Sequence, residues 1–301
     1  MSIEHVERVE TVPALPPRGR TAHKGTMGTV MVVGGAPGMI GAPALTSLSA
    51  LRGGAGLVMM ALPASIQPFA AVLCPCATSV RLPVDDAGDL SPAAPAAVAD
   101  AAGRADVLAV GPGMGRGDVQ QAVVRTVLGG EPPIVLDADG LNNLSALDDW
   151  PSVAGGPLVL TPHPGEMSRL TGAPIKVIQS DRERAAVEAA RGWQAGRSDD
   201  APLVCVLKGA GTVVTDGRRL YVNTTGNPGM ATGGTGDVLT GLIAALIGQG
   251  LEPFDAAVLG VYLHGDAGDA VASRLCDVSL IATDLVDELP HAFRRHASPS
   301  R

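Results

Sequence analysis

The fold class follows from a glycine-rich stretch that runs directly into an apolar one, NPGMATGGTGD at residues 227–237 and VLTGLIAALI at residues 238–247. Val238, Leu242 and Leu246 recur at helical spacing, so the glycines are predicted to lie at the start of a helix. The first N–H groups of a helix have no partner within it, and glycine lets an anion approach them without a Cβ in the way. The pattern therefore favours an anion site built from main chain.

Asp237 falls in the first turn of this predicted helix. The helix dipole stabilises a carboxylate there, so we expect Asp237 to be ionised and able to accept a proton from a hydroxyl. That role suits phosphoryl transfer, although a capping aspartate would give the same local pattern. No Gly-Lys-Ser/Thr follows the glycines, and the acidic residue of a dinucleotide fingerprint is missing, which disfavours a Walker A loop and a Rossmann site.

Short apolar runs elsewhere in the chain predict the buried strands of a parallel α/β sheet. Several are followed by Ala- and Leu-rich stretches with helical spacing, such as residues 42–51 and 185–195, and residues 212–215 and 219–222 flank an Asp-Gly turn typical of a hairpin. The predicted strands are Thr29–Val33, Val107–Val110, Ile134–Leu136, Leu158–Leu160 and Leu203–Leu207.

The strand and helix rhythm continues through the chain, so we predict a single domain over residues 23–289. Both ends are polar and lack apolar periodicity, which predicts an N-terminal tail over residues 1–22 and a C-terminal tail over residues 290–301. Without a signal pattern or an apolar stretch of membrane-spanning length, we expect a cytoplasmic protein that does not enter a membrane.

Composition excludes several partners. The formal net charge of −8 disfavours a general polyanion binder, and an aromatic content of 2% disfavours stacking on single-stranded nucleic acid. Cys74 and Cys76 are too close for the usual zinc or redox spacing and Cys205 lies in an apolar run, so we expect reduced, structural thiols. A phosphate ligand would therefore be held by a local site rather than by a basic surface.

Ligands of such sheets bind beyond the carboxyl ends of the strands. Residues 208–212 follow one predicted strand and offer the cation of Lys208 with a turn that could receive a phosphate, although a lone lysine there could equally be solvated. Residues 111–115 are glycine-rich and could form either a close approach to a ligand or a tight turn. Residues 137–142 supply two carboxylates and an amide, which could bind a metal, bind ribose or substrate hydroxyls, or cap the next helix.

Two histidines lie in segments with recognisable patterns. In residues 161–166 two prolines fix the backbone and aim His163 and Glu166, and no second His or Cys lies at zinc-ligand spacing. His264 lies in an Ala- and Val-rich helical pattern, so we expect a structural histidine.

Together these motifs resemble those of the ADP- or ATP-dependent NAD(P)H-hydrate dehydratases of the ribokinase-like superfamily. The resemblance covers about residues 24–285 and implies a three-layer α/β/α fold with a mainly parallel central sheet. The loop at residues 36–40 departs from it, because the aromatic residue expected there is missing. The motifs that carry the resemblance are residues 24–28, 34–42, 50–56, 111–115, 137–142, 161–166, 208–212 and 233–237.

The resemblance implies an ADP-dependent dehydratase that repairs NADH or NADPH hydrated at C6 of the nicotinamide. The enzyme phosphorylates the C6 hydroxyl and eliminates phosphate, giving NAD(P)H, AMP and phosphate. Ala42, Gly113, His163 and Asp237 would contact the hydrate, with Asp237 as the base. The nucleotide, ADP or alternatively ATP, would be held by Lys208, Gly209, Ala210, Gly211, Thr212, Gly233, Gly234, Thr235 and Gly236.

Further expectations come with the resemblance. Mg²⁺ would bridge phosphate oxygens. Because Mg²⁺ keeps several water ligands and binds largely through substrate phosphates, no protein ligand is assigned to it. We expect a homo-oligomer, a tetramer by resemblance. The residues before Lys24 are too few for an epimerase domain, so we expect a separate NAD(P)H-hydrate epimerase as functional partner.

Two other functions remain open at this point. A ribokinase-like kinase of a hydroxymethylpyrimidine or thiazole vitamin precursor would share the glycine loop and Asp237, although the segments around His163 and Lys208 favour the dehydratase. A nucleotide-binding sensor without activity could use the same fold, but the presence of Asp237 argues against it.

Overall fold

The computed structural model describes residues 5–297 and contains a ten-stranded sheet in the order β1-β10-β9-β8-β7-β6-β5-β2-β3-β4. The pairs β8–β9 and β9–β10 are antiparallel and the other pairs are parallel. The strands are β1 (Glu7–Arg8), β2 (Thr29–Val33), β3 (Leu57–Pro63), β4 (Thr78–Leu82), β5 (Val107–Val110), β6 (Ile134–Leu136), β7 (Leu158–Leu160), β8 (Leu203–Leu207), β9 (Val213–Thr215) and β10 (Arg219–Val222).

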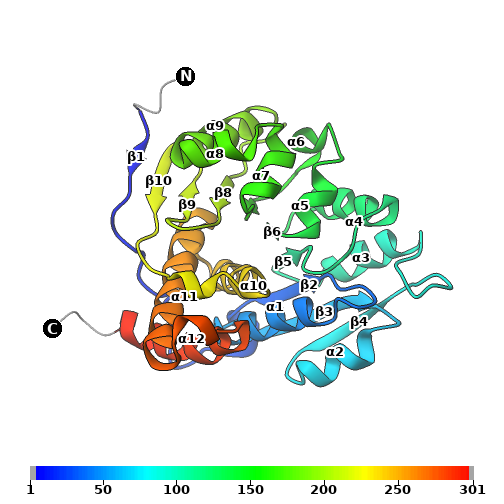
Figure 1. Cartoon of the computed structure of the whole chain (residues 1–301). Helices are drawn as coiled ribbons and strands as arrows, with labels where there is room; N and C mark the ends of the chain where they lie inside the picture. The colour runs from blue at the N-terminus through cyan, green and yellow to red at the C-terminus, as the bar shows by residue number, and fades with distance from the viewer. Residues whose placement is uncertain (1–4, 298–301) are drawn as a thin grey trace.

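Helices cover both faces of the sheet (Figure 1). One face carries α1, α10, α11 and α12, and the other carries the helices from α3 to α9, which confirms the three-layer α/β/α class. The α-helices are α1 (Gly41–Arg52), α2 (Gln67–Leu73), α3 (Ala94–Ala102), α4 (Asp118–Leu128), α5 (Asp139–Leu144), α6 (Trp150–Val153), α7 (Pro164–Thr171), α8 (Ile175–Ser180), α9 (Arg182–Ala195), α10 (Thr235–Gly248), α11 (Pro253–Leu275) and α12 (Ala282–Ala297). The 3₁₀ helices are η1 (Lys24–Thr26), η2 (Pro228–Met230) and η3 (Asp277–Ser279).

The central strands are apolar on both sides because helices pack on both faces. In β2, Val30 and Val32 face the core under α10 and α11, whereas Met31 and Val33 face the core under α3 and α4. All five strands predicted from apolar runs occur with the predicted bounds, and the predicted hairpin is the antiparallel pair β9–β10. The continuous apolar runs therefore correspond to strands that helices cover on both faces of the sheet.

Helix α10 is fixed against α1 by very close backbone contact. A Cβ built on Gly241 would lie 2.0 Å from the carbonyl oxygen of Thr46, so only glycine allows this approach. Ser49 of α1 adds a buried hydrogen bond from its hydroxyl to the carbonyl of Val238. The start of α10 is consequently held in one position relative to the sheet.

Both predicted tails are wrong over the part of the chain that the structure describes; residues 1–4 and 298–301 lie outside it. Near the N-terminus β1 pairs with β10, and Val9, Val12 and Leu15 pack against the core. At the other end α12 runs through Pro290 to Ala297 and buries Ala292. Apolar contacts with the domain order both segments despite their polar composition.

Within residues 5–297, no helix has both the length and the apolar character needed to cross a membrane. None of the four cysteines, all within residues 5–297, forms a disulfide; Cys74 and Cys205 are buried, as suits a structural thiol, while Cys76 and Cys276 are exposed.

Candidate active site

The start of α10 has the glycine-rich geometry that the sequence predicts. Gly234 precedes the helix with a φ of +93°, and a Cβ there would lie 2.7 Å from Leu45, so this position requires glycine. Asp237 lies in the first turn. A Cβ on Gly236 would lie 3.3 Å from Lys208 Nζ, which places the N-terminal turn of the helix directly beside the lysine that follows β8.

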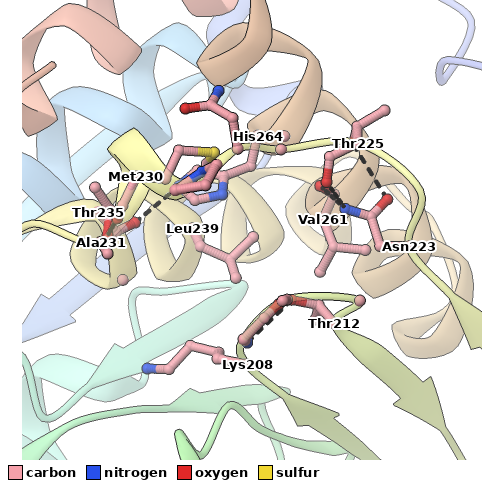
Figure 2. Close-up of a pocket in the computed structure, with 18 of the residues that line it drawn as sticks. Lys208, Thr212, Asn223, Thr225, Met230, Ala231, Thr235, Leu239, Val261 and His264 are labelled. Atoms are coloured by element: carbon pink, nitrogen blue, oxygen red, sulfur yellow. Dashed lines mark hydrogen bonds between the residues drawn. The ribbon is translucent and has the colours of Figure 1, made fainter. Parts of the chain in front are cut away.

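A pocket of about 480 Å³ opens between the end of β8 and the start of α10. Lys208 and Thr212 lie on one side of it, and Thr235 and Leu239 of α10 lie on another (Figure 2). The remaining wall is formed by residues 223–231 and by α11. All five residues of the predicted segment 208–212 line this pocket.

The polar groups of the far wall are held by internal hydrogen bonds. The Asn223 amide donates to the carbonyls of Thr225 and Val261, each at 3.1 Å, and the Thr225 hydroxyl donates to the Tyr262 carbonyl at 2.9 Å. His264 Nε2 lies 2.9 Å from the Thr235 carbonyl, and burial lowers the pKa of His264 to about 4. His264 is thus a neutral, hydrogen-bonded residue of the pocket wall, in line with the structural role expected for it.

A second pocket of about 380 Å³ adjoins the first. Its own residues include Asp137, His163, Glu166 and Asp237, at the carboxyl ends of β6 and β7 and at the start of α10. The residues common to both pockets are Lys208, Gly209, Thr235 and Gly236. The two pockets form two compartments that meet at the lysine and at the helix start.

Lys208, whose side chain is 17% exposed, forms an ion pair with the buried Asp137 at this boundary. The other carboxylate oxygen of Asp137 accepts a hydrogen bond from the Thr240 hydroxyl at 2.8 Å. Burial by itself would raise the pKa of Asp137, but the Lys208 ammonium and the hydrogen bonds of Thr161 and Thr240 outweigh it and hold the pKa below its ordinary value. Asp137 is therefore a weak base with both oxygens engaged.

The environment of Asp237 raises its pKa, whereas that of Asp137 lowers the pKa of Asp137. Burial raises the pKa of Asp237 to about 7, Asp137 and Asp139 add to the rise, and Lys208 opposes it. The expectation that the helix dipole keeps Asp237 fully ionised is therefore wrong. The dipole contributes about 0.3–1 kcal/mol, whereas one pKa unit corresponds to about 1.4 kcal/mol. Asp237 titrates near neutral pH, where a proton-accepting group works best.

His163 and Glu166 form a capping box at the start of α7. The His163 N–H donates to Glu166 Oε2 at 2.8 Å, and His163 Nδ1 accepts the N–H groups of Gly165 at 2.9 Å and of Glu166 at 3.3 Å. Glu166 is only 4% exposed, and burial raises its pKa to about 7, with Lys208 opposing the rise. A second carboxyl that titrates near neutrality therefore lines the same compartment as Asp237.

The structure brings together only part of the predicted substrate set. His163 and Asp237 line the second pocket, whereas Ala42 and Gly113 contact each other at the start of α1. A Cβ on Gly113 would lie 3.1 Å from the Ala42 Cβ. Of the glycine-loop residues, Thr235 and Gly236 line both pockets, Gly234 lines the second, and Gly233 belongs to neither.

Sequence reasoning left several lining residues out of the site. Asp137 belongs to a segment for which the sequence leaves metal binding, hydroxyl binding and helix capping open, and Glu166 is expected to be oriented by two prolines but has no predicted role; the position of both after predicted strands was an available signal. Asn223, Thr225 and Met230 reach the first pocket from a segment without a recognisable pattern. Only the folded chain shows that this segment faces β8.

Metal binding by the protein alone is not indicated. Among residues 5–297, no three His, Cys, Asp or Glu side chains gather in a way that could hold a metal ion. Mg²⁺ does not require such a cage, because it keeps several waters and binds through substrate phosphates.

Comparison with known proteins agrees with this geometry. The model of the NAD(P)H-hydrate dehydratase family matches residues 30–291. The chain belongs to the NAD(P)H-hydrate dehydratase family. It is 46% identical over 285 residues to the bifunctional NAD(P)H-hydrate repair enzyme of Moorella thermoacetica, covering 93% of this chain and 52% of that enzyme. The chain spans about half the length of the first curated relatives that it matches.

Single-function members of the NAD(P)H-hydrate dehydratase family match over most of their length. The ADP-dependent (S)-NAD(P)H-hydrate dehydratase of Neisseria meningitidis serogroup B is 38% identical over 264 residues, which cover 84% of this chain and 80% of that enzyme. The crystal structure of the Bacillus subtilis ADP/ATP-dependent NAD(P)H-hydrate dehydratase, co-crystallized with ATP/Mg²⁺, superposes with a TM-score of 0.80 at 32% identity. That match covers 94% of this chain and 95% of the Bacillus chain.

Proposed function

We propose that this protein is an ADP-dependent (S)-NAD(P)H-hydrate dehydratase. It transfers a phosphoryl group from ADP to the C6 hydroxyl of hydrated NADH or NADPH and then eliminates phosphate, releasing NAD(P)H, AMP and phosphate. The observation that carries the proposal is the pair of adjoining pockets that share Lys208, Gly209, Thr235 and Gly236 in a chain of this family. One compartment suits the nucleotide and the other suits the hydrate.

Asp237 is the base toward the C6 hydroxyl. It lines the second pocket, and the neighbouring Gly236 lines both pockets, so its carboxylate lies where a phosphate and a hydroxyl would meet. A pKa of about 7 leaves a large fraction of the carboxylate ionised at neutral pH while making it a stronger proton acceptor than an ordinary aspartate. His163 lines the same compartment and would contact the hydrate; contacts from Ala42 and Gly113, which do not line this pocket, rest on the family resemblance alone.

The phosphates lie against the start of α10 and the turn at residues 209–212. Unpaired N–H groups of the first helical turn favour an anion, and Gly236 leaves room for it beside Lys208. Electrostatic stabilisation by such preorganised groups is the main contribution expected in phosphoryl transfer. Mg²⁺, carried on the nucleotide phosphates, would neutralise charge that develops on the transferred group.

The test is a nucleotide-dependent dehydration assay. Purified protein is incubated with NADPH hydrate and Mg²⁺, ADP or ATP is added separately, and the returning dihydronicotinamide absorbance is followed. A rise that depends on the nucleotide establishes the activity, and the faster nucleotide is the donor; we expect ADP. A folded protein that gives no rise with either nucleotide would favour the vitamin-precursor kinase, whose product is a stable phosphate ester.

Three expectations about the cellular context stay predictions: a homotetramer, a cytoplasmic location and a separate NAD(P)H-hydrate epimerase as functional partner. The Moorella relative is named bifunctional, which supports a link between the two repair steps. Light scattering on the purified protein measures the oligomeric state directly.

A further inference from the structure

The proposed function requires the removal of two protons, and Asp237 accounts for only one. Hydration of the nicotinamide adds a hydroxyl to C6 and a hydrogen to C5, so dehydration must break a C–H bond at C5 as well as the O–H bond at C6. The two protons leave at different steps from different atoms. The chemistry of the substrate therefore calls for a second proton acceptor in the compartment that holds the nicotinamide.

Asp137 is unsuited to this task although it lines the second pocket. One of its carboxylate oxygens pairs with Lys208 and the other accepts the Thr240 hydroxyl. Its side chain is 2% exposed and that of Glu166 is 5% exposed, so the difference between them lies in their partners: Asp137 is paired directly with Lys208, whereas Lys208 Nζ is 3.9 Å from Glu166 Oε2. Taking up a proton would break the pair with a fixed cation.

His163 is excluded by its hydrogen bonds. Its Nδ1 accepts two backbone N–H groups at the start of α7, so the proton of the neutral ring is assigned to Nε2, which lies 3.4 Å from Glu166 Oε1. Accepting another proton would require the ring to give up the cap of α7. Burial and the nearby Lys208 and Arg169 also hold the pKa of His163 below its usual value.

Glu166 has the position and the partners that a second base needs. It lines the same compartment as Asp237, and its carboxyl is fixed on both sides by the His163 backbone N–H at 2.8 Å and the His163 ring at 3.4 Å. Lys208 Nζ is 3.9 Å from its Oε2, a longer distance than in the Lys208–Asp137 pair. Burial, which raises the pKa of Glu166 to about 7, strengthens it as a proton acceptor.

We infer that Glu166 removes the C5 proton in the elimination step. In the first step Asp237 accepts the hydroxyl proton while the C6 oxygen bonds to the β-phosphorus of ADP and AMP departs. In the second step the C6–O bond breaks and its electron pair leaves with phosphate. The C5–H electron pair then forms the C5–C6 double bond and the proton passes to Glu166. This inference rests on the proposed function and divides its two steps between two carboxylates.

If Asp237 and Glu166 act in separate steps, AMP formation can be uncoupled from NADPH formation. Without the C5 base, phosphate can still leave, and the electrophilic C6 recaptures water, so ADP is consumed without net dehydration. In Glu166→Gln we expect AMP to form while NADPH formation falls, with the ratio of NADPH to AMP lowered on the order of 10²-fold from the wild-type value of one. Asp237→Asn should lose both products together, and the exposed control Glu131→Gln should keep the wild-type ratio.

The experiment measures AMP by chromatography and NADPH by absorbance in the same reaction. An unchanged ratio in Glu166→Gln, or parallel loss of both products in a variant that still melts cooperatively and binds ADP, would overturn the inference. Glu166→Asp, which keeps a carboxyl, should restore part of the coupling and provides a second reading if Glu166→Gln fails to fold. Absence of both products in the wild-type protein would instead refute the proposed function, so the two failures are distinguishable.

Discussion

The ammonium of Lys208 forms an ion pair with the buried carboxylate of Asp137 at the boundary between the two pockets. Burial alone would lower the pKa of Lys208, but Asp137 and Glu166 raise it above the ordinary value, so the lysine remains charged. The cation is thus held by the protein before any phosphate arrives. The lysine is fixed in the site instead of being solvated, which was the alternative left open by its sequence context.

Removing this cation should affect both stability and nucleotide binding. Lys208→Met leaves Asp137 buried without its partner, a change that typically costs about 3–5 kcal/mol of unfolding free energy. Adding Asp137→Asn removes the unpaired charge and should recover part of the loss. Urea denaturation measures both effects, with the exposed Lys176→Met as control. Calorimetry should show weaker ADP binding in Lys208→Met, with hydrate binding less affected; unchanged ADP affinity would remove Lys208 from the phosphate site.

Asp237→Asn should abolish turnover while making the protein more stable at high pH. Loss of a general base typically lowers the rate by about 10²–10⁴-fold. Because the pKa of Asp237 is raised to about 7, the folded state keeps a proton that the unfolded state releases above about pH 4. Wild-type stability therefore falls as pH rises from 4 to 7, and the neutral asparagine avoids this loss.

The measurements for Asp237→Asn are steady-state rates and melting temperatures between pH 4 and pH 8. The variant should melt above the wild type at pH 8 and at the same temperature near pH 4. The exposed Asp148→Asn is the matched control and should change neither quantity. Near-normal activity of Asp237→Asn would remove Asp237 from the role of base.

Gly236→Ala tests the junction of the compartments. The added methyl group would lie 3.3 Å from Lys208 Nζ and 3.5 Å from an Asp137 oxygen, so the lysine must shift by a few tenths of an ångström. Since misplacement of a catalytic group by 1 Å can cost about 10²-fold, we expect a loss of kcat on the order of 10-fold. Gly192→Ala, which adds a methyl group to an exposed helix position with free space, should leave kcat unchanged.

The pH dependence should distinguish the two steps. Asp237 and Glu166 both have pKa values raised to about 7 by burial, and each must lose its proton before it can accept another. The rate of NADPH formation should therefore increase as pH rises through 7 and decrease below it more steeply than one titrating group allows. In Glu166→Gln, AMP formation should follow a single group. A wild-type profile that is flat between pH 5 and pH 8 would contradict this expectation.

Much of the fold could be predicted because the strands under two helical layers are continuous apolar runs. Strand β3 was not predicted from the sequence, because residues 57–63 are mostly Leu, Met and Ala, which have high helix propensity. Val58 is the only β-branched residue in this strand. Strand β4 lies at the edge of the sheet and includes the exposed Arg81, and β1 has two polar residues. Their strand conformation is imposed by the neighbouring strands.

The site was predictable to the extent that the chemistry lies next to a turn or a strand end. The helix start, Asp237 and the Lys208 segment were found in this way. The pKa values of Asp237 and Glu166 were not, because they depend on burial and on charges brought from distant parts of the chain, such as Asp137. The end of α12 was predicted to be a tail because residues 290–301 are polar and lack apolar periodicity, yet Ala292 is buried in the helix.

The contact between Gly241 and the Thr46 carbonyl limits how far α10 can move. A helix that contacts its neighbour at backbone distance cannot rotate or slide without a steric clash. Helix α10 and the Asp237 carboxylate it carries are therefore fixed relative to α1. The opposite wall is held as well: residues 223–231 form an irregular segment with one 3₁₀ turn, and the backbone N–H of Gly226 and the side chain of Asn227 both donate hydrogen bonds to Asp269 of α11. Both walls of the pocket are therefore set by the fold itself, before any ligand is bound.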